Sequence, residues 1–305
     1  MIPVLVGVTM LSFMLLEFVP GDICDVILSR SAYAEQEDFD RCRERFGLND
    51  SPIQRYGEWL GGVVRFDFGD SYWTNTPISD ELVKRIPISV ELAVLSVFFS
   101  TILGIAIGLI SATRQDSVID YAGRIFTVIG LSIPNFVIGT ILLLFLAIQF
   151  EWIPPVTYQR LREDPWGNLQ QFIFPALLLG FGLAASIARM TRSTMLEVLR
   201  QDYIRTAWAK GLRERSVIMR HALRNAMIPV ITIVGLQFGV LLGGEVVMEI
   251  LFGLPGIGYT LVNTVLQKDL PFLQALILIT AAAYVTVNLL VDLSYGFLDP
   301  RVRYS

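Results

Sequence analysis

The chain has 305 residues, of which 53% are hydrophobic and 17% are charged, and its mean hydropathy is +0.57. Soluble domains average roughly 45–50% apolar residues and carry more charge, so the composition argues against a soluble protein and for one that meets lipid several times. The net charge of −4 excludes the broad basic field that attracts nucleic acid.

Six segments are apolar enough to be membrane-spanning helices, since crossing roughly 30 Å of hydrocarbon takes about 20 residues. In chain order the predicted spans are residues 2–19, 89–112, 125–150, 172–188, 227–251 and 272–293. Helix breakers bracket or interrupt several of them, at Pro20-Gly21, Pro87, Pro154-Pro155, Pro175, Pro229, Pro255-Gly256 and Pro271. We therefore predict an all-α integral membrane protein with a first transmembrane helix (1–20), an external segment (21–87) and a five-helix core (88–305).

The external segment is polar and acid-rich. Residues 36–46 are charged and predict a short surface helix, and residues 51–64 predict an amphipathic helix. Trp59, Tyr72 and Trp73 are suited to the level of the lipid headgroups. Because no small-residue cleavage site follows the first span, we interpret that span as an uncleaved anchor.

Both cysteines of the chain, Cys24 and Cys42, lie in the external segment. In an oxidising compartment they could form a disulfide. Spacing alone does not establish the geometry that a disulfide demands, so two free thiols are the alternative. No Cys/His cluster accompanies them, and the sequence predicts no metal site.

The orientation follows from Lys and Arg in the loops, because basic residues favour the cytoplasmic side. Those after even-numbered spans are Arg114, Arg124, Arg189, Arg192, Arg200, Arg205, Lys210, Arg213, Arg215, Arg220 and Arg224, with Arg301 and Arg303 in the tail. The short loops after odd-numbered spans hold only Arg160, Arg162 and Lys268. This bias predicts that both termini are cytoplasmic.

Polar residues inside the predicted spans are candidates for a translocation pathway, because such residues usually face a cavity or a neighbouring helix. They are Ser132, Asn135, Gln237, Glu245, Asn288 and Asp292, with Pro134 expected to break its helix and free backbone carbonyls. The alternative is that they hold helices together, as the small residues Gly235, Gly239, Gly243 and Gly244 would also do.

The loop at residues 189–226 predicts a helix, a glycine turn and a second helix. The first helix extends to Lys210, Gly211 ends it, and Ser216 is expected to cap the second helix. Its first part carries a weak apolar stripe made of Met195, Val198, Leu199 and Ala207. A simple topogenic loop would explain the positive charge, but a connection of about two to eight residues would serve that purpose. The length favours a rigid knob that docks on another protein.

Several motifs are missing. The chain has no GxxxxGK[ST] loop for nucleotides, and residues 253–258, although glycine-rich, are better interpreted as a turn. There is no GxSxG, HExxH or Cys/His set, and the one histidine, His221, is interpreted as a surface or interface residue. The sequence therefore predicts no catalytic residue and no cofactor in this chain.

Residues 203–212, which read Tyr-Ile-Arg-Thr-Ala-Trp-Ala-Lys-Gly-Leu, resemble the "EAA" loop of ABC-importer permeases. The general consensus begins with an acidic residue, where this chain has Arg205, and this departure favours the peptide and nickel branch of the family. Further matching motifs, in order, start at Pro20, Asp67, Pro87, Arg189, His221, Glu249, Pro255, Asn288 and Asp299.

The resemblance implies a type I permease subunit of the bacterial inner membrane. A homologous second permease chain would complete the pore, and an external substrate-binding protein would deliver the substrate. Two cytoplasmic ATPase subunits would bind ATP and Mg²⁺. The residues implied in coupling to the ATPase are Asp202, Tyr203, Arg205, Thr206, Ala207, Lys210, Gly211, Leu212, Arg213, Glu214 and Arg215.

The implied substrates are di- and oligopeptides, with nickel chelates, glutathione or other small solutes as alternatives. An ion-gradient-driven secondary transporter or channel is the rival function, although we find none of the inverted symmetry that such proteins often show. A membrane-embedded enzyme is a third reading, which the missing catalytic set argues against.

Overall fold

The computed structural model describes residues 2–17, 21–28, 35–155 and 157–298. Within these ranges the regular structure is helical, apart from one isolated antiparallel bridge between Asp70 and Pro77. The motif residues Pro20 and Asp299 and the basic tail residues Arg301 and Arg303 lie outside the described residues.

The chain divides into two compact units, which are described separately. The first contains residues 1–89, 243–250 and 255–285, and the second contains residues 90–242, 251–254 and 286–305. The helices α5 (Ile78–Thr113) and α14 (Leu270–Leu298) each contribute residues to both units.

The N-terminal helices of the first unit are short. They are α1 (Ile2–Glu17), α2 (Ile23–Leu28), α3 (Gln36–Arg45) and α4 (Pro52–Val63). The predicted surface helix and amphipathic helix are therefore present as α3 and α4. Ser51 caps α4 by accepting the Gln54 backbone N–H, and Pro52 occupies a first-turn position where its missing N–H is harmless. Tyr56 holds α4 to α1 through a 3.0 Å hydrogen bond with Thr9.

A disulfide joins α2 to α3 through Cys24 and Cys42, whose Cα atoms are 5.9 Å apart. Arg43 strengthens the same connection by donating from Nε to Asp22 Oδ2 at 2.8 Å. That hydrogen bond raises the pKa of Arg43, which is a charged group at any physiological pH.

The apolar core of the first unit lies where the start of α5 meets α13 (Ile257–Leu266) and the start of α14. Its buried residues are Ile78, Leu82, Ile257, Phe272, Ala275 and Leu276. The helix α12 (Val246–Leu251) precedes α13, and Gly253, with φ at +65°, makes the turn expected for the glycine-rich segment.

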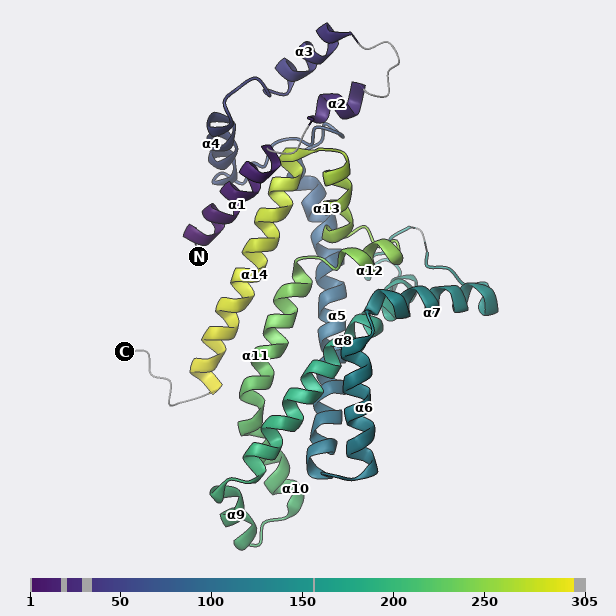
Figure 1. Cartoon of the computed structure of the whole chain (residues 1–305), viewed down its shortest axis with the longest axis vertical. Helices are drawn as coiled ribbons and strands as arrows, with labels where there is room; N and C mark the ends of the chain where they lie inside the picture. The colour runs from purple at the N-terminus through teal and green to yellow at the C-terminus, as the bar shows by residue number, and fades with distance from the viewer. Residues whose placement is uncertain (1, 18–20, 29–34, 156, 299–305) are drawn as a thin grey trace. The chain divides into compact units, whose positions relative to one another are not determined.

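In the second unit, α8 (Pro165–Leu199) packs on α6 (Val118–Ser132) (Figure 1), and glycines of α5 lie against α8. The approach of α5 to α8 is close because Gly108 has no side chain. A Cβ atom at Gly108 would lie 2.6 Å from the Ala188 carbonyl oxygen. Small residues permit such close helix contacts inside membranes.

By length and composition, four helices of the described residues can cross a membrane: Ile78–Thr113, Pro165–Leu199, Glu214–Leu242 and Leu270–Leu293. A fifth crossing is possible if α6 and α7 (Asn135–Phe150) count as one span, although they meet at an angle of 93°. The apolar helix Pro3–Met14 is shorter than the roughly 20 residues that a span needs. The count of six spans therefore stays a prediction.

The predicted span boundaries need three corrections. Pro87 was expected to bracket the second span, but it lies inside α5, which begins nine residues earlier at Ile78. The third span is interrupted at Ile133 and Pro134. The fifth, predicted to reach residue 251, ends at Leu242, because Gly244 adopts φ +91° and turns the chain into α12.

Candidate functional site

The loop after α8 contains a short helix, α9 (Asp202–Ala209), that ends at a glycine turn (Figure 1). Gly211 has φ +74°, a left-handed conformation that glycine adopts without steric penalty. Its N–H donates to the Trp208 carbonyl at 2.9 Å, and the Leu212 N–H donates to the Ala207 carbonyl at 3.4 Å. These two bonds form a Schellman cap, so the predicted stop at Gly211 is confirmed.

The returning helix begins earlier than predicted. Arg213 is the N-cap, and α10 (Glu214–Ser216) leads through a π-helical turn, Val217–Ala222, into α11 (Leu223–Leu242). Ser216 therefore lies inside the helix and does not cap it, which corrects the expectation for this residue. An N-cap residue has an extended backbone conformation, and Arg213 meets this requirement with φ −62° and ψ 138°.

The loop has its own apolar core. Met195, Ile204, Ala207, Val217 and Ala222 are all buried there, with Ala112 and Ala226 beside them. Met195 and Ala207 are buried and Val198 and Leu199 pack against them, as the predicted apolar stripe requires. The single helix predicted to carry the stripe as far as Lys210 is wrong, because α8 ends at Leu199 and Ala207 belongs to α9. Fully burying residues of this kind contributes about 1.5–3 kcal/mol each for the larger side chains. The loop is therefore a folded knob.

Hydrogen bonds from Tyr203 fasten α9 to the returning helix. Asn225 Nδ2 donates to the Tyr203 hydroxyl oxygen at 2.8 Å and to the His221 carbonyl at 3.2 Å. The Tyr203 hydroxyl also lies 3.5 Å from that carbonyl. His221 thus contributes its backbone to the brace.

The outer surface of the knob is aromatic and cationic. Tyr203, Trp208 and Leu212 keep 39–44% of their surface exposed. The exposed cations around them are Arg205, Lys210, Arg213 and Arg215. Exposed aromatic residues and arginines of this kind are enriched in protein–protein interfaces. Of the eleven residues that the sequence marks in this loop, the structure buries only Ala207 and leaves the other ten exposed.

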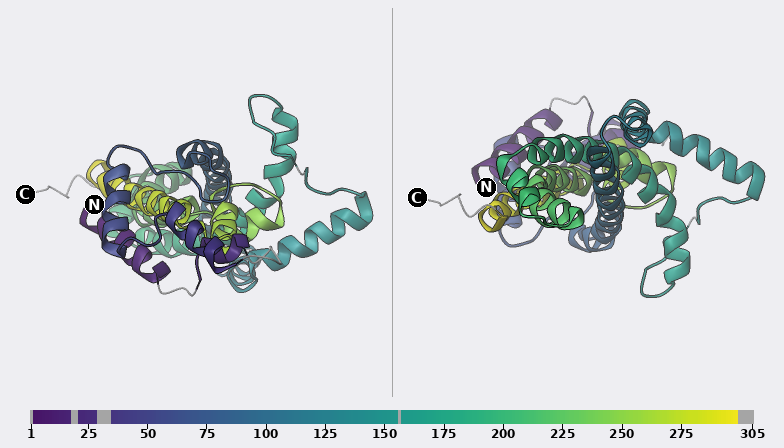
Figure 2. Two further views of the ribbon diagram at one scale, coloured as in Figure 1. Left: turned by 90° about the horizontal axis from the view of Figure 1, so that it is seen from above. Right: turned by 90° about the horizontal axis from the view of Figure 1, so that it is seen from below.

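Three of the predicted pathway residues lie at one break between helices. Ser132 ends α6, Pro134 is the N-cap of α7, and Asn135 is its first residue. Pro134 forces the extended conformation of Ile133 before it, with φ −96° and ψ 122°. The Asn135 side chain lies against α8, since a Cβ atom at Gly182 would be 2.7 Å from its Oδ1. Figure 2 shows α7 leading away from α6 beyond this break.

The other predicted pathway residues are elsewhere in the fold. Gln237 is in α11 and Asn288 is in α14, and the side-chain oxygen of each is buried with no hydrogen-bond partner among the described residues. Buried polar atoms normally have partners, so these two oxygens are exceptions in the part of the chain that the structure describes. Glu245 lies in the turn between α11 and α12, outside the span where the sequence placed it. Asp292 is in α14, and the pathway role of all seven residues stays a prediction.

Glu249 of α12 is a buried carboxylate for which sequence reasoning predicted no role. Its Oε2 accepts the Tyr259 backbone N–H at 2.8 Å, and its Oε1 accepts the Ser89 hydroxyl at 2.6 Å. The Ile257 N–H in turn donates to the Ser89 oxygen at 2.8 Å. Glu249 and Ser89 thereby serve N–H groups that the first turn of α13 cannot pair internally. The one sequence feature that could have indicated this role is the position of Glu249, an acidic residue shortly before Pro255-Gly256, where α13 begins.

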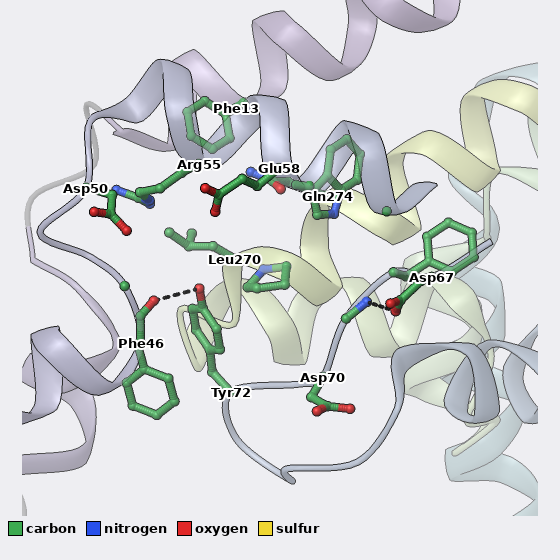
Figure 3. Close-up of a pocket in the computed structure, with 16 residues that line it drawn as sticks. Phe13, Phe46, Asp50, Arg55, Glu58, Asp67, Asp70, Tyr72, Leu270 and Gln274 are labelled. Atoms are coloured by element: carbon green, nitrogen blue, oxygen red, sulfur yellow. Dashed lines mark hydrogen bonds between the residues drawn. The ribbon is translucent and has the colours of Figure 1, made fainter. Parts of the chain in front are cut away.

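A cavity of about 320 Å³ lies in the first unit, between α4 and the loop before α5 (Figure 3). Asp50, Arg55 and Glu58 lie on one side of it, and Asp70 and Tyr72 lie on the other. Arg55 stands over the Phe13 ring at 5.6 Å, and the Tyr72 hydroxyl donates to the Phe46 carbonyl at 3.4 Å. Burial raises the pKa of Tyr72, so this phenol stays neutral and keeps its donor proton.

A family model described as "Binding-protein-dependent transport system inner membrane component" matches residues 104–304. The oligopeptide transport system permease protein AppB of Bacillus subtilis is 39% identical over 306 residues, which cover 99% of this chain and 96% of that protein. The dipeptide transport system permease protein DppB of Alkalihalophilus pseudofirmus is 37% identical over 324 residues, covering 100% and 97%.

Among solved structures, the fold resembles a chain of the MetNI methionine ABC transporter in an inward-facing conformation. The TM-score is 0.57 at 17% sequence identity, and the match covers 71% of this chain and 95% of that one. At this identity the likeness concerns the fold alone.

Proposed function

This chain belongs to the family of binding-protein-dependent transport system inner membrane components, and on that premise we propose that it is the permease subunit of an ATP-driven importer of di- and oligopeptides. The observation that carries the proposal is the folded knob at residues 202–215, which exposes aromatic and basic side chains. The names of the oligopeptide and dipeptide permeases that match over nearly the full chain support the substrate class.

The knob suits a mechanical role because its outer surface is held on a packed base. Ile204 and Ala207 anchor α9 from beneath, while Tyr203 is braced to the returning helix. A separate ATPase subunit would seat this surface in a cleft, close on ATP and Mg²⁺, and push the knob as a rigid body. In this arrangement ATP chemistry takes place on the partner, and the present chain is a transport subunit and not an enzyme.

We place the knob and both termini on the cytoplasmic side of a bacterial inner membrane, because the basic residues concentrate in that set of loops. The segment with α2, α3 and α4 then lies in the periplasm. The Cys24–Cys42 disulfide supports this orientation, since such bonds persist in oxidising compartments.

The complete importer would contain a second, homologous permease chain, two ATPase subunits and a periplasmic substrate-binding protein. The pathway would run at the interface of the two permeases, with Ser132, Asn135, Gln237, Glu245 and Asn288 as candidates for its polar lining. Gln237 and Asn288 support this because leaving a buried oxygen without a hydrogen bond is costly, and a rearrangement that opened the pathway would let these oxygens accept from peptide N–H groups or water.

The test is uptake of labelled peptides of two to six residues into proteoliposomes that contain the whole complex. Uptake that needs ATP and the binding protein, and that persists when ionophores collapse all ion gradients, is the expected result. Uptake without ATP that ionophores abolish would instead establish a gradient-driven transporter. ATP-driven uptake of a nickel chelate, with none of any peptide, would change the substrate and leave the mechanism in place.

A further inference from the structure

The carboxylate of Asp120 is completely buried and binds two arginines. Arg192 of α8 donates from Nε to Oδ1 at 2.7 Å and from Nη2 to Oδ2 at 2.9 Å, so the two side chains form a bidentate pair. Arg124 donates from Nη2 to Oδ2 at 2.7 Å, and the Asp116 backbone N–H adds a bond of 3.0 Å. Four donors therefore neutralise and fix a single carboxylate.

The two arginines play different structural parts. Arg124 is four residues after Asp120 in the same helix, α6, so its bond adds no connection between helices. Arg192 belongs to α8, 72 residues away, and its pair with Asp120 joins α6 to α8. The Asp120–Arg192 pair is thus a clamp between two helices.

The clamp lies next to the knob along α8. Met195, one helical turn after Arg192, is buried in the knob's core together with Ala112 at the inner end of α5. The end of α8 is therefore fixed twice within one turn, by a polar bond to α6 and by apolar contact with α5. Two residues after α8 ends at Leu199, α9 begins at Asp202.

We propose that Asp120 and Arg192 are positioning residues that transmit movement of the knob to α6, an inference that rests on the proposed coupling to an ATPase. From Asp120, α6 runs to Ser132 and the break at Pro134, where the predicted pathway residues Ser132 and Asn135 lie. Movement at the knob would reach this break through α6.

Geometry explains why a bidentate pair suits this task. A single hydrogen bond lets two helices slide or rotate past each other, whereas a planar guanidinium on two carboxylate oxygens fixes both distance and orientation. Because the Asp120 carboxylate is completely buried, separating it from Arg192 would cost it two of its four hydrogen bonds where water cannot replace them. The clamp therefore makes α6 move together with α8 at this point.

The experiment uses the whole complex in proteoliposomes and measures peptide molecules imported per ATP hydrolysed. Arg192→Ala should lower this ratio by about tenfold, within the range by which coupling energies between two sites usually act. Arg192→Lys keeps the positive charge but not the two-pronged contact, and should lower the ratio as well. Arg189→Ala is the matched control, since Arg189 is an exposed arginine one turn earlier in α8, and its ratio should equal that of the wild type.

A role limited to stability gives a different result, because fewer complexes would assemble while each one imported the normal amount per ATP. An Arg192→Ala ratio equal to that of Arg189→Ala would overturn the proposal. The proposed function is judged separately on the wild type: if wild-type uptake did not depend on ATP, that function would fail before any variant was compared.

Discussion

The Ser89 hydroxyl donates a 2.6 Å hydrogen bond to the carboxylate of Glu249, a residue 160 positions later in the chain. Both side chains are buried, and Gly256 makes room for them, since a Cβ atom there would lie 2.5 Å from each. Together with the backbone N–H groups of Ile257 and Tyr259, they tie the start of α13 to α5 and α12.

The first prediction concerns this link. Replacing Glu249 by alanine strands the Ser89 hydroxyl and the Tyr259 N–H in a buried site, and we expect a loss of about 2–4 kcal/mol of stability. The melting temperature of the detergent-solubilised protein would show it as a clear decrease. Glu245→Ala, four residues earlier and only half-buried, is the control and should change the melting temperature much less. Equal melting temperatures for both variants would mean that the link does not stabilise the fold.

The second prediction concerns the glycine turn of the knob. Proline fixes φ near −65° and has no N–H, whereas Gly211 has φ +74° and donates to the Trp208 carbonyl. Gly211→Pro should therefore disrupt the cap and uncouple ATP hydrolysis from peptide uptake, while membrane insertion stays normal. Uptake and insertion are measured in the same membranes, and unchanged uptake would contradict the docking role of the knob.

The third prediction concerns the charge on the knob's surface. Arg205 and Lys210 are exposed, and reversing both to glutamate should weaken binding of the ATPase subunits by about tenfold at low salt, with less effect at high salt. Co-purification at two ionic strengths measures this. Reversing the exposed Arg160, which lies outside the knob, should leave ATPase binding unchanged.

The fourth prediction concerns the disulfide between α2 and α3. It closes a loop with a sequence separation of 18 residues, for which the chain-entropy model gives about 3 kcal/mol of stabilisation. Reductant should lower the melting temperature of the wild type but not that of a Cys24→Ser/Cys42→Ser variant. Labelling of wild-type thiols by a maleimide before any reduction would show that the bond is absent.

The fifth prediction concerns orientation. A reporter that works only in the cytoplasm should be active when it is fused after Ser305, and one that works only in the periplasm should be inactive there. The reason is that the basic residues favour a cytoplasmic location for the loops after even-numbered spans. Activity of the periplasmic reporter alone would show that the topology is inverted, and the knob would then be out of reach of a cytoplasmic ATPase.

Sequence reasoning succeeded where the signal was local. Gly211 ends its helix because this position has a left-handed backbone conformation, which glycine adopts more easily than other residues. The presence of glycine in the sequence therefore indicated the helix end. The burial of Met195 agrees with the helical spacing of its neighbours Val198 and Leu199, whereas Ala207 reaches the same core from a separate helix, α9. The amphipathic helix α4 was equally local, with Ser51 and Pro52 at its start.

What sequence reasoning missed depends on contacts between distant residues. No role was predicted for Glu249 because its partners, Ser89 and the start of α13, are brought to it only by folding. Pro87 looked like a helix boundary, yet the helix had already begun at Ile78. The sequence contains many arginines near Arg192, and it does not show which of them pairs with Asp120. Only the packing of α6 against α8 brings Arg192 to that carboxylate.

The right-angled junction at Pro134 has a consequence for the surroundings of this chain. In a continuing helix the Gly130 carbonyl would accept a hydrogen bond from the N–H of residue 134, but Pro134 has no N–H. Because α6 ends at Ser132, its last carbonyl groups have no partners in the hydrogen-bond series of that helix. Hydrocarbon offers such oxygens nothing to bond with. Wherever the junction lies at the depth of the lipid tails, a film of water or a neighbouring subunit must shield it, so an isolated copy of this chain is ill-suited to a bare bilayer.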